Sequence, residues 1–519
     1  MSNLQLIKRL YRGKTCYSDA LSEAELELLQ LPSGVDTIVE EMLKENRIIF
    51  LTGNPGDGKT FIIRRATKTR PGLYVIPDLN NLSVAKMEKE MQQILACYHN
   101  HKPCIVAANE FPLRGLMQML ANVAPDFHRE LLGIKQNTII LDYPSVSLGR
   151  ICVVDLNDRS LLDKERTIIE PTVKKFLNLL QDNWGINSYL DYNLNALSDS
   201  LVLQQYIKLF SLISLTGEHF AIRDILGTVA YTLTACTLED ADEEVSYYYD
   251  AIFSGDNALM RIAASFDPVL LSKPSLDEAL WNGELQDGWR LGMPEKWPCD
   301  IAEVEQAVDL FKSIKRRFYF ENGLSRSLEE LQPVDYQECE KILVEIRSKN
   351  KEIKRRLIRS MNKLFLSSDN ESSRLRVWTT HGFDLTRESG AAVSTRYIDG
   401  ADLELAYPEP AKWLNKLEYT PSYLVLRYKN ESKTEAKARL QIDLDMLKAL
   451  IAIENGYPVA LLSTQYESKL SRFLHSLCSA SAARDYSEGE LILANRREGT
   501  SKKIFIEDDK YELSAGGAL

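Results

Sequence analysis

Short apolar runs alternate with amphipathic segments between residues 47 and 164. Each run is rich in β-branched residues and predicts a buried strand, whereas the segments at 83–97 and 113–123 have helical spacing. This alternation is typical of a parallel sheet covered by helices, and it predicts an α/β core. The strands are predicted at 47–52, 73–77, 104–108, 137–142 and 150–155.

The pattern changes on both sides of this core. Residues 1–46 are predicted to be helical, and Ser22 followed by acidic residues is a typical helix start. Residues 165–370 show helical spacing almost throughout and predict a helical domain that ends in a long charged helix at 333–365. Residues 371–519 predict a mixed α+β domain. Its strands are expected at 374–379, 403–405, 423–428, 439–442 and 503–506, and its helices at 444–454 and 467–480.

Composition narrows the class of protein. The chain has 519 residues and a net charge of −11, so any contact with nucleic acid must come from a local basic patch. Its eight cysteines are scattered and form no C-x-x-C pair, as in proteins of a reducing compartment. No apolar run approaches the roughly 20 residues of a membrane span. We therefore expect a soluble cytoplasmic protein without a membrane partner.

The most informative motif follows the first predicted strand. It matches G-x-x-x-x-G-K-[ST], in which a glycine-rich loop and a helix N-terminus surround a polyphosphate. We expect Lys59 to contact the β- and γ-phosphates of ATP and Thr60 to bind Mg²⁺. The predicted nucleotide-binding residues are Gly53, Asn54, Pro55, Gly56, Asp57, Gly58, Lys59, Thr60 and Phe61.

Hydrolysis at such a loop needs acidic groups nearby. Asn109 and Glu110 end the third predicted strand, where Glu110 is the candidate for activating water and Asn109 for the metal side. Asp78 ends the second predicted strand and is a further metal candidate. The alternatives are a surface or capping role for Glu110 and helix capping for Asp78.

Two later segments add candidates for sensing phosphate. Asn157 and Arg159 follow the last predicted strand of the core, where a polar residue and a cation can stabilise transferred charge. Arg223 begins a predicted helix and could also reach the nucleotide. The alternative for Arg159 is a salt bridge within the loop.

Residues 347–363 are strongly basic. They contain eight cations against one acid, Glu352, which gives a local net charge of +7. Binding of DNA phosphates and a solvated helix face are both consistent with this charge. The cations are Arg347, Lys349, Lys351, Lys354, Arg355, Arg356, Arg359 and Lys363.

Taken in order, these motifs resemble those of the ATPase subunits of bacterial anti-phage defence operons, in particular the DptF type of DNA phosphorothioation-dependent restriction systems. The resemblance covers roughly residues 20–330. It rests on the glycine-rich motif and on the segments 107–110 and 153–160, and it extends to the segments 217–224, 266–268 and 316–320. It departs from the pattern at Phe111, where related ATPases often have glycine.

The resemblance implies an AAA-like P-loop NTPase that uses ATP and Mg²⁺ and works with other subunits of a defence complex on foreign DNA, with homo-oligomerisation as an option. Two alternatives stay open from the sequence. One is a slow nucleotide-dependent sensor or scaffold, which the amide of Asn109 in place of a carboxylate favours. The other is a stand-alone DNA-stimulated ATPase.

Overall fold

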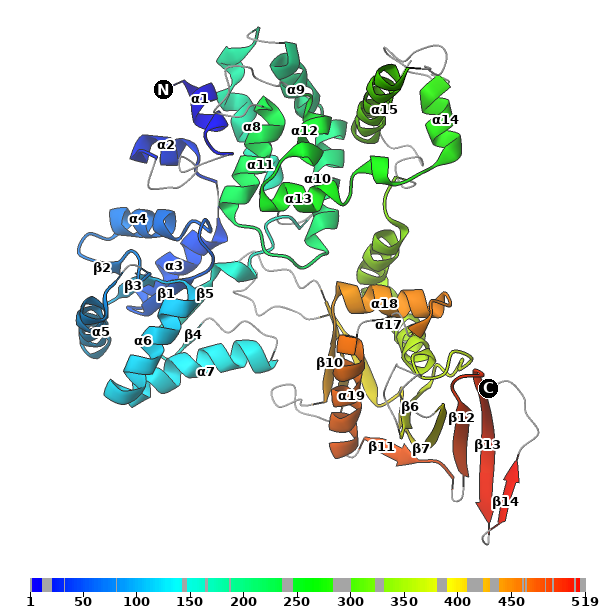
Figure 1. Ribbon diagram of the computed structural model, residues 1–519. Coiled ribbons are helices and arrows are strands. Elements are labelled where there is room, and N and C mark those ends of the chain that lie inside the picture. Colours follow the sequence, from blue (N-terminus) through cyan, green and yellow to red (C-terminus); the bar gives the residue numbers. More distant parts are fainter. Residues whose placement is uncertain are drawn as a thin grey trace. The chain divides into compact units, whose positions relative to one another are not determined.

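The computed structural model contains two compact units (Figure 1). The first unit contains the described residues up to Pro333 except Leu215–Gly217. The second unit contains Leu215–Gly217 and the described residues from Val334 onward. The structure describes residues 2–11, 21–31, 33–80, 82–141, 147–163, 167–185, 188–235, 246–282, 300–322, 331–379, 390–407, 423–429, 438–459, 462, 464–480, 482–487, 490–507 and 510–513.

The first unit is built on a sheet in the order β2-β3-β1-β5-β4. The first four of these strands run parallel, and β4 pairs antiparallel with β5. The parallel sheet predicted from the sequence is therefore confirmed. The strands are β1 (Ile48–Thr52), β2 (Tyr74–Ile76), β3 (Cys104–Ala107), β4 (Ser147–Leu148) and β5 (Ile151–Asp155).

Helices cover both faces of this sheet. Side chains of β1 alternate between two apolar clusters: Ile48 and Phe50 pack with the helices α5, α6 and α7, whereas Ile49 and Leu51 pack with α3 and α4. All five residues of β1 are buried, which explains the continuous apolar run in the sequence. The helices are α3 (Gly34–Lys44), α4 (Lys59–Thr69), α5 (Val84–His99), α6 (Glu110–Val123) and α7 (Pro125–Leu141).

The strand predicted at 137–142 is wrong, because α7 continues to Leu141. Position 142 lies outside the described residues. Phe127, Leu131 and Ile134 are buried at helical spacing and anchor α7 against the sheet. Once a helix is anchored in this way, a few β-branched residues cost it only a few tenths of a kcal/mol each. Tertiary packing therefore overrides the local β propensity here.

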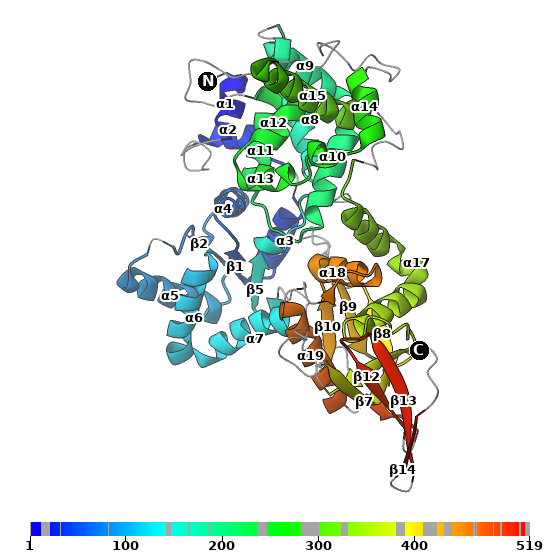
Figure 2. The ribbon, with the colours of Figure 1, turned by 45° about the vertical axis from the view of Figure 1, so that its right-hand side comes forward.

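The rest of the first unit is helical, as predicted for the middle of the chain. Helix α11 packs against α1, α8, α9, α12 and α13, and Figure 2 shows it inside this group. The predicted helix start at Ser22 is confirmed as a capping box with Glu25. These helices are α1 (Asn3–Lys8), α2 (Glu23–Leu28), α8 (Ile169–Leu179), α9 (Ser188–Ser198), α10 (Ser200–Ser214), α11 (Ile222–Thr234), α12 (Tyr248–Ser254), α13 (Ala258–Ala264), α14 (Pro274–Asn282) and α15 (Ile301–Glu321).

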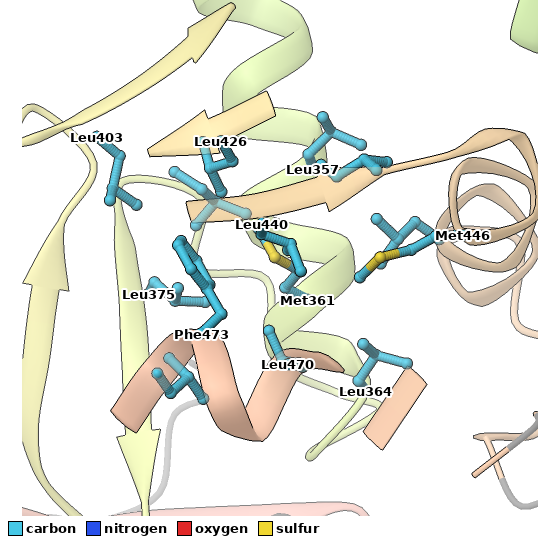
Figure 3. Close-up of a cluster of buried hydrophobic side chains, with 14 of the residues drawn as sticks. Leu357, Met361, Leu364, Leu375, Leu403, Leu426, Leu440, Met446, Leu470 and Phe473 are labelled. Carbon is cyan, nitrogen blue, oxygen red and sulfur yellow. The ribbon is translucent and has the colours of Figure 1, made fainter. Parts of the chain in front are cut away.

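The second unit combines helices with two antiparallel sheets, in the orders β10-β9-β8 and β11-β7-β12-β13-β14, with β6 paired to β7. The long helix α17 belongs to this unit, so the boundary predicted at 370 lies inside it. In Figure 3, Leu357 and Met361 of α17 lie in one apolar cluster with Phe473 of α19 and side chains of the strands. The elements are α17 (Val334–Lys363), β6 (Arg374–Trp378), β7 (Ala391–Asp399), β8 (Leu403–Ala406), β9 (Leu424–Tyr428), β10 (Arg439–Ile442), α18 (Leu444–Glu454), α19 (Thr464–Ser479), β11 (Ala483–Asp485), β12 (Glu490–Asn495), β13 (Thr500–Glu507) and β14 (Lys510–Leu513).

A buried ion pair joins the segment that follows α17 to the larger sheet. Arg376 Nε donates to Asp369 Oδ2 at 2.7 Å, and the two side chains are 5% and 0% exposed. A buried charge is tolerated only when it is paired and hydrogen-bonded. No described helix is long and apolar enough to cross a membrane.

We predict that Arg376→Ala destabilises the protein by about 3–5 kcal/mol, because it leaves the Asp369 carboxylate buried without its cation. Lys502→Ala, which removes an exposed cation from β13 of the same sheet, should change stability by less than about 0.5 kcal/mol. Chemical denaturation of the two variants tests this. Equal stability of both would show that the pair does not hold this junction.

Candidate functional site

A glycine-rich loop connects β1 to α4. Gly53, Gly56 and Gly58 have φ values of 140°, 100° and 86°. A Cβ on Gly53 would lie 2.8 Å from Asp57 Oδ2, and one on Gly56 would lie 3.2 Å from Ala221 Cβ. Glycine is therefore required here for both backbone conformation and space. The glycines of the sequence motif form a tight turn at the carboxyl end of a buried strand.

Helix α4 begins at Lys59, directly after this loop, with Gly58 as its N-cap. The first backbone N–H groups of a helix have no partner within the helix and carry partial positive charge. Lys59 Nζ donates to the carbonyl oxygens of Gly53 at 2.7 Å and Asn54 at 2.8 Å. Burial lowers the pKa of this ammonium, while the nearby carboxylates of Asp57 and Asp78 act in the opposite direction. Positive charge and N–H donors thus converge at one point.

The loop is held by its own side chains. Asp57 is 2% exposed, and its Oδ2 accepts the backbone N–H of Asn54 at 2.6 Å. The same N–H also approaches Oδ1 of Asn157 at 3.2 Å. Asn157 lies in the 3-10 turn Leu156–Asp158 after β5, so it contacts the loop, as its position in the sequence suggested.

The helical region touches the loop from the other side. His219 Nε2 lies 2.8 Å from Asp57 Oδ1, and the backbone N–H of Arg223 donates to the carbonyl of Gly56 at 3.2 Å. Residues that are more than 160 positions apart therefore form one site. The side chain of Arg223 also lines the cavity described below.

Polar groups gather where the parallel strands end. Thr52 ends β1 and is paired in register with Asp155 of β5, while Asn109 follows β3 on the other side. Within the described part of the chain, Thr52 Oγ1 and Asn109 Oδ1 are buried without a hydrogen-bond partner. Buried oxygens of this kind usually have a water, an ion or a ligand as partner. The set suits a hydrated cation or a bound water.

Glu110 stands apart from the other candidates. It is the first residue of α6, its side chain is 46% exposed, and it pairs with Arg114 at 3.2 Å. It is not among the residues that line the cavity. The adjacent Phe111 is 86% exposed. The structure therefore brings Asn109 to the cavity beside the loop, whereas the side chain of Glu110 lies at the surface.

Asp78 and Arg159 both line the cavity. Asp78 follows β2, and its Oδ1 accepts the N–H of Asn80 at 2.8 Å. Arg159 is 7% exposed and donates to Oγ of Ser33, the N-cap of α3, at 3.1 Å. The two side chains thus bring one negative and one positive charge to the loop.

The loop opens into a cavity of about 360 Å³. One part of its wall is polar and consists of the loop, the start of α4, Asp78, Asn109 and Arg159. The remainder is mostly apolar and combines side chains from three separate parts of the chain. These are Leu10, Leu21, Leu26, Leu29, Leu31, Ile168, Ile222 and Leu226.

A resident metal would have few strong ligands at this site. The described residues contain no group of three or more His, Cys, Asp or Glu side chains that could hold a metal ion. Thr60, Asp78, Asn109 and Thr52 supply only oxygen atoms, which suits Mg²⁺, a cation that retains several waters when bound. The residues fit a magnesium ion that comes with a phosphate ligand.

Much of the basic segment at 347–363 is engaged within the second unit. Lys354 donates to the carbonyls of Gly400 and Leu403, and Arg356 and Arg359 both pair with Glu454. In contrast, Lys351 and Arg355 are exposed on α17.

Another basic run, at 315–317, is structural. Lys315 is 3% exposed and pairs with Asp277 at 2.6 Å, while Arg316 pairs with Asp250 and Asp267.

Three features of the site were not predicted from the sequence. Asp155 could have been found, since it ends a strand parallel to β1. The contact between His219 and Asp57 has no local signal, because it depends on how the helical region folds back. The same is true of the leucines from the N-terminal segment that line the cavity.

Comparison of the chain with protein-family models, with curated proteins and with solved structures finds no match.

Proposed function

We propose that the chain is an ATP-binding and ATP-hydrolysing protein of the P-loop, AAA-like class. The observation that carries this proposal is the glycine loop, which closes over Lys59 at the start of α4 and opens into the cavity. N–H donors, a lysine and a helix N-terminus on a tight turn are what a polyphosphate requires.

The wall of the cavity supports a nucleotide rather than a free phosphate. Its polar part lies at the loop, and its apolar part is formed by leucines between positions 10 and 31, by Ile168 before α8, and by Ile222 and Leu226 of α11. A nucleoside triphosphate has the same division between charged phosphates and a flat base. Arg159 and Arg223 also line the cavity, and both could neutralise phosphate charge.

In the proposed mechanism, Lys59 exchanges the carbonyls of Gly53 and Asn54 for phosphate oxygens. Binding of an anion favours the charged ammonium, whose pKa burial lowers. Mg²⁺ would be held by Thr60, with Asn109 and Asp78 as further oxygen donors, and would neutralise charge on the phosphates. Glu110 is the candidate for activating water.

The helical region supports the AAA-like class, because its α11 begins against the loop. The cellular role that we propose is the ATPase subunit of a bacterial anti-phage defence complex, which couples nucleotide state to assembly or DNA processing by partner subunits. This role follows from the sequence resemblance. The resemblance motifs at 266–268 and 316–320 are joined by the pair between Arg316 and Asp267.

A slow nucleotide-dependent sensor or scaffold is the second candidate. The observation that favours it is the position of Glu110, which is about half exposed, paired with Arg114 and outside the cavity wall. Turnover then requires Glu110 to move toward the loop, or a partner to complete the site. Comparing turnover with and without DNA distinguishes the two candidates from a stand-alone DNA-stimulated ATPase.

We predict that Lys59→Ala weakens ATP binding by roughly tenfold to a hundredfold, because it removes a charge-assisted hydrogen bond to phosphate. Lys68→Ala is the matched control, since Lys68 is on the same helix, is exposed and pairs with Glu27. Titration with a fluorescent ATP analogue measures both. Wild-type affinity in the Lys59 variant would contradict the assignment.

Glu110→Gln should bind ATP normally and lower kcat roughly a hundredfold or more, because an amide does not accept a proton from water. Glu88→Gln, an exposed position on α5, is the control. Release of phosphate under saturating ATP is the measurement. If kcat does not change, Glu110 is not the base, and Asp78→Asn and Asp155→Asn should be tested next.

We expect any DNA contact of α17 to be made by its exposed cations, Lys351 and Arg355. Lys351→Glu with Arg355→Glu should then weaken duplex binding and reduce the salt slope by about two units. Lys86→Glu with Lys89→Glu makes the same change of net charge on exposed positions of α5. Titrating labelled duplex at two salt concentrations tests this. Equal isotherms for both double variants and the wild type would assign DNA binding to a partner.

A further inference from the structure

We infer that His219 is a positioning residue that holds the glycine loop in its phosphate-binding conformation through Asp57. This inference rests on the proposed function and concerns how the same site is regulated. It follows from a chain of contacts that begins in the helical region and ends at the backbone of the loop. None of these contacts is visible in the sequence motif.

The first contact is between His219 and Asp57, at 2.8 Å. The His219 side chain is 16% exposed and that of Asp57 is 2% exposed, so solvent screens this pair weakly. Among the described atoms, His219 Nδ1 is buried without a hydrogen-bond partner. A carboxylate oxygen only accepts hydrogen bonds, so this contact assigns a proton to Nε2 of the ring. His219 therefore donates to the carboxylate.

The second contact is between Asp57 and the backbone N–H of Asn54, at 2.6 Å. This bond closes the turn that starts at Gly53. A Cβ on Gly53 would lie 2.8 Å from Asp57 Oδ2, so the carboxylate fills the space beside the glycine. The two donors to the carboxylate, His219 and the Asn54 N–H, approach its two different oxygens. Loss of either donor leaves a buried charge less well hydrogen-bonded.

The same segment of the helical region holds the loop at a second point. The backbone N–H of Arg223 donates to the carbonyl of Gly56, which is the residue before Asp57. Arg223 belongs to α11, which packs against α1, α8, α9, α12 and α13. Any change of loop geometry on binding phosphate therefore acts on the centre of the helical region. His219 is the side chain in this connection that lies outside the loop sequence, so it can be substituted without replacing a loop residue.

The test compares His219→Leu with His219→Gln, whose amide can still donate to Asp57. Amide hydrogen exchange of the loop peptide is measured in the full-length protein without nucleotide, and ATP affinity and kcat are measured alongside. We expect His219→Leu to speed exchange of the loop amides about tenfold and to weaken ATP binding about tenfold, with little change in kcat at saturation. His219→Gln should restore most of the slow exchange of the loop amides and most of the ATP affinity.

Two controls separate positioning from general destabilisation. His128→Leu removes a partly buried histidine of α7 in the same unit and should leave loop exchange unchanged. The double variant Asp57→Asn/His219→Leu should cost no more in ATP affinity than Asp57→Asn alone, because both changes break one connection. Full additivity would show that His219 acts elsewhere.

Unchanged loop exchange in His219→Leu overturns the inference, as does failure of His219→Gln to restore it. Failure of the proposed function gives a different result. In that case the wild type binds no ATP, while loop exchange still decides whether His219 holds Asp57.

Discussion

The site depends on the complete burial of β1. All five of its residues are buried, and its four apolar residues pack alternately into two apolar clusters on opposite faces of the sheet, which fixes the position of the strand. A parallel sheet buried on both faces also directs the ends of β1, β3 and β5 to one edge. Thr52, Asn109 and Asp155 meet there as a result, and the glycine loop begins at the same place. The geometry of the loop thus rests on the packing of the strand that directly precedes it.

The parts of this arrangement that have local causes could be predicted from the sequence. The alternation of buried runs and amphipathic segments predicted five strands, four of which form the parallel part of the sheet, and the helical middle of the chain, because each element carries its own periodicity. The glycine motif predicted where the loop turns. The strand prediction at 137–142 was wrong because the cause of its conformation is not local. The packing of Phe127, Leu131 and Ile134, which lie outside the run, determines that it is helical.

Contacts between distant segments limit how much of the site could be predicted from the sequence. Asp57 appears in the motif as a variable position, yet it is buried and contacts His219 from the helical region. Glu110 was predicted to end a strand, whereas it is the first residue of α6, and its side chain lies at the surface and pairs with Arg114. The basic segment at 347–363 has a high net charge in the sequence, and several of its cations are used inside the second unit. Sequence spacing gives the positions of such groups, whereas folding decides their partners.

We propose that the loop and the adjoining cavity bind ATP as one site. The most direct measurement is the pattern of amide hydrogen exchange in the wild-type protein with and without ATP and Mg²⁺. We expect protection of the loop at 53–61 together with the leucine-rich segment at 21–31 and the start of α11, since all three contribute residues to the cavity wall. Protection confined to other regions, or no change at saturating ATP, would contradict it.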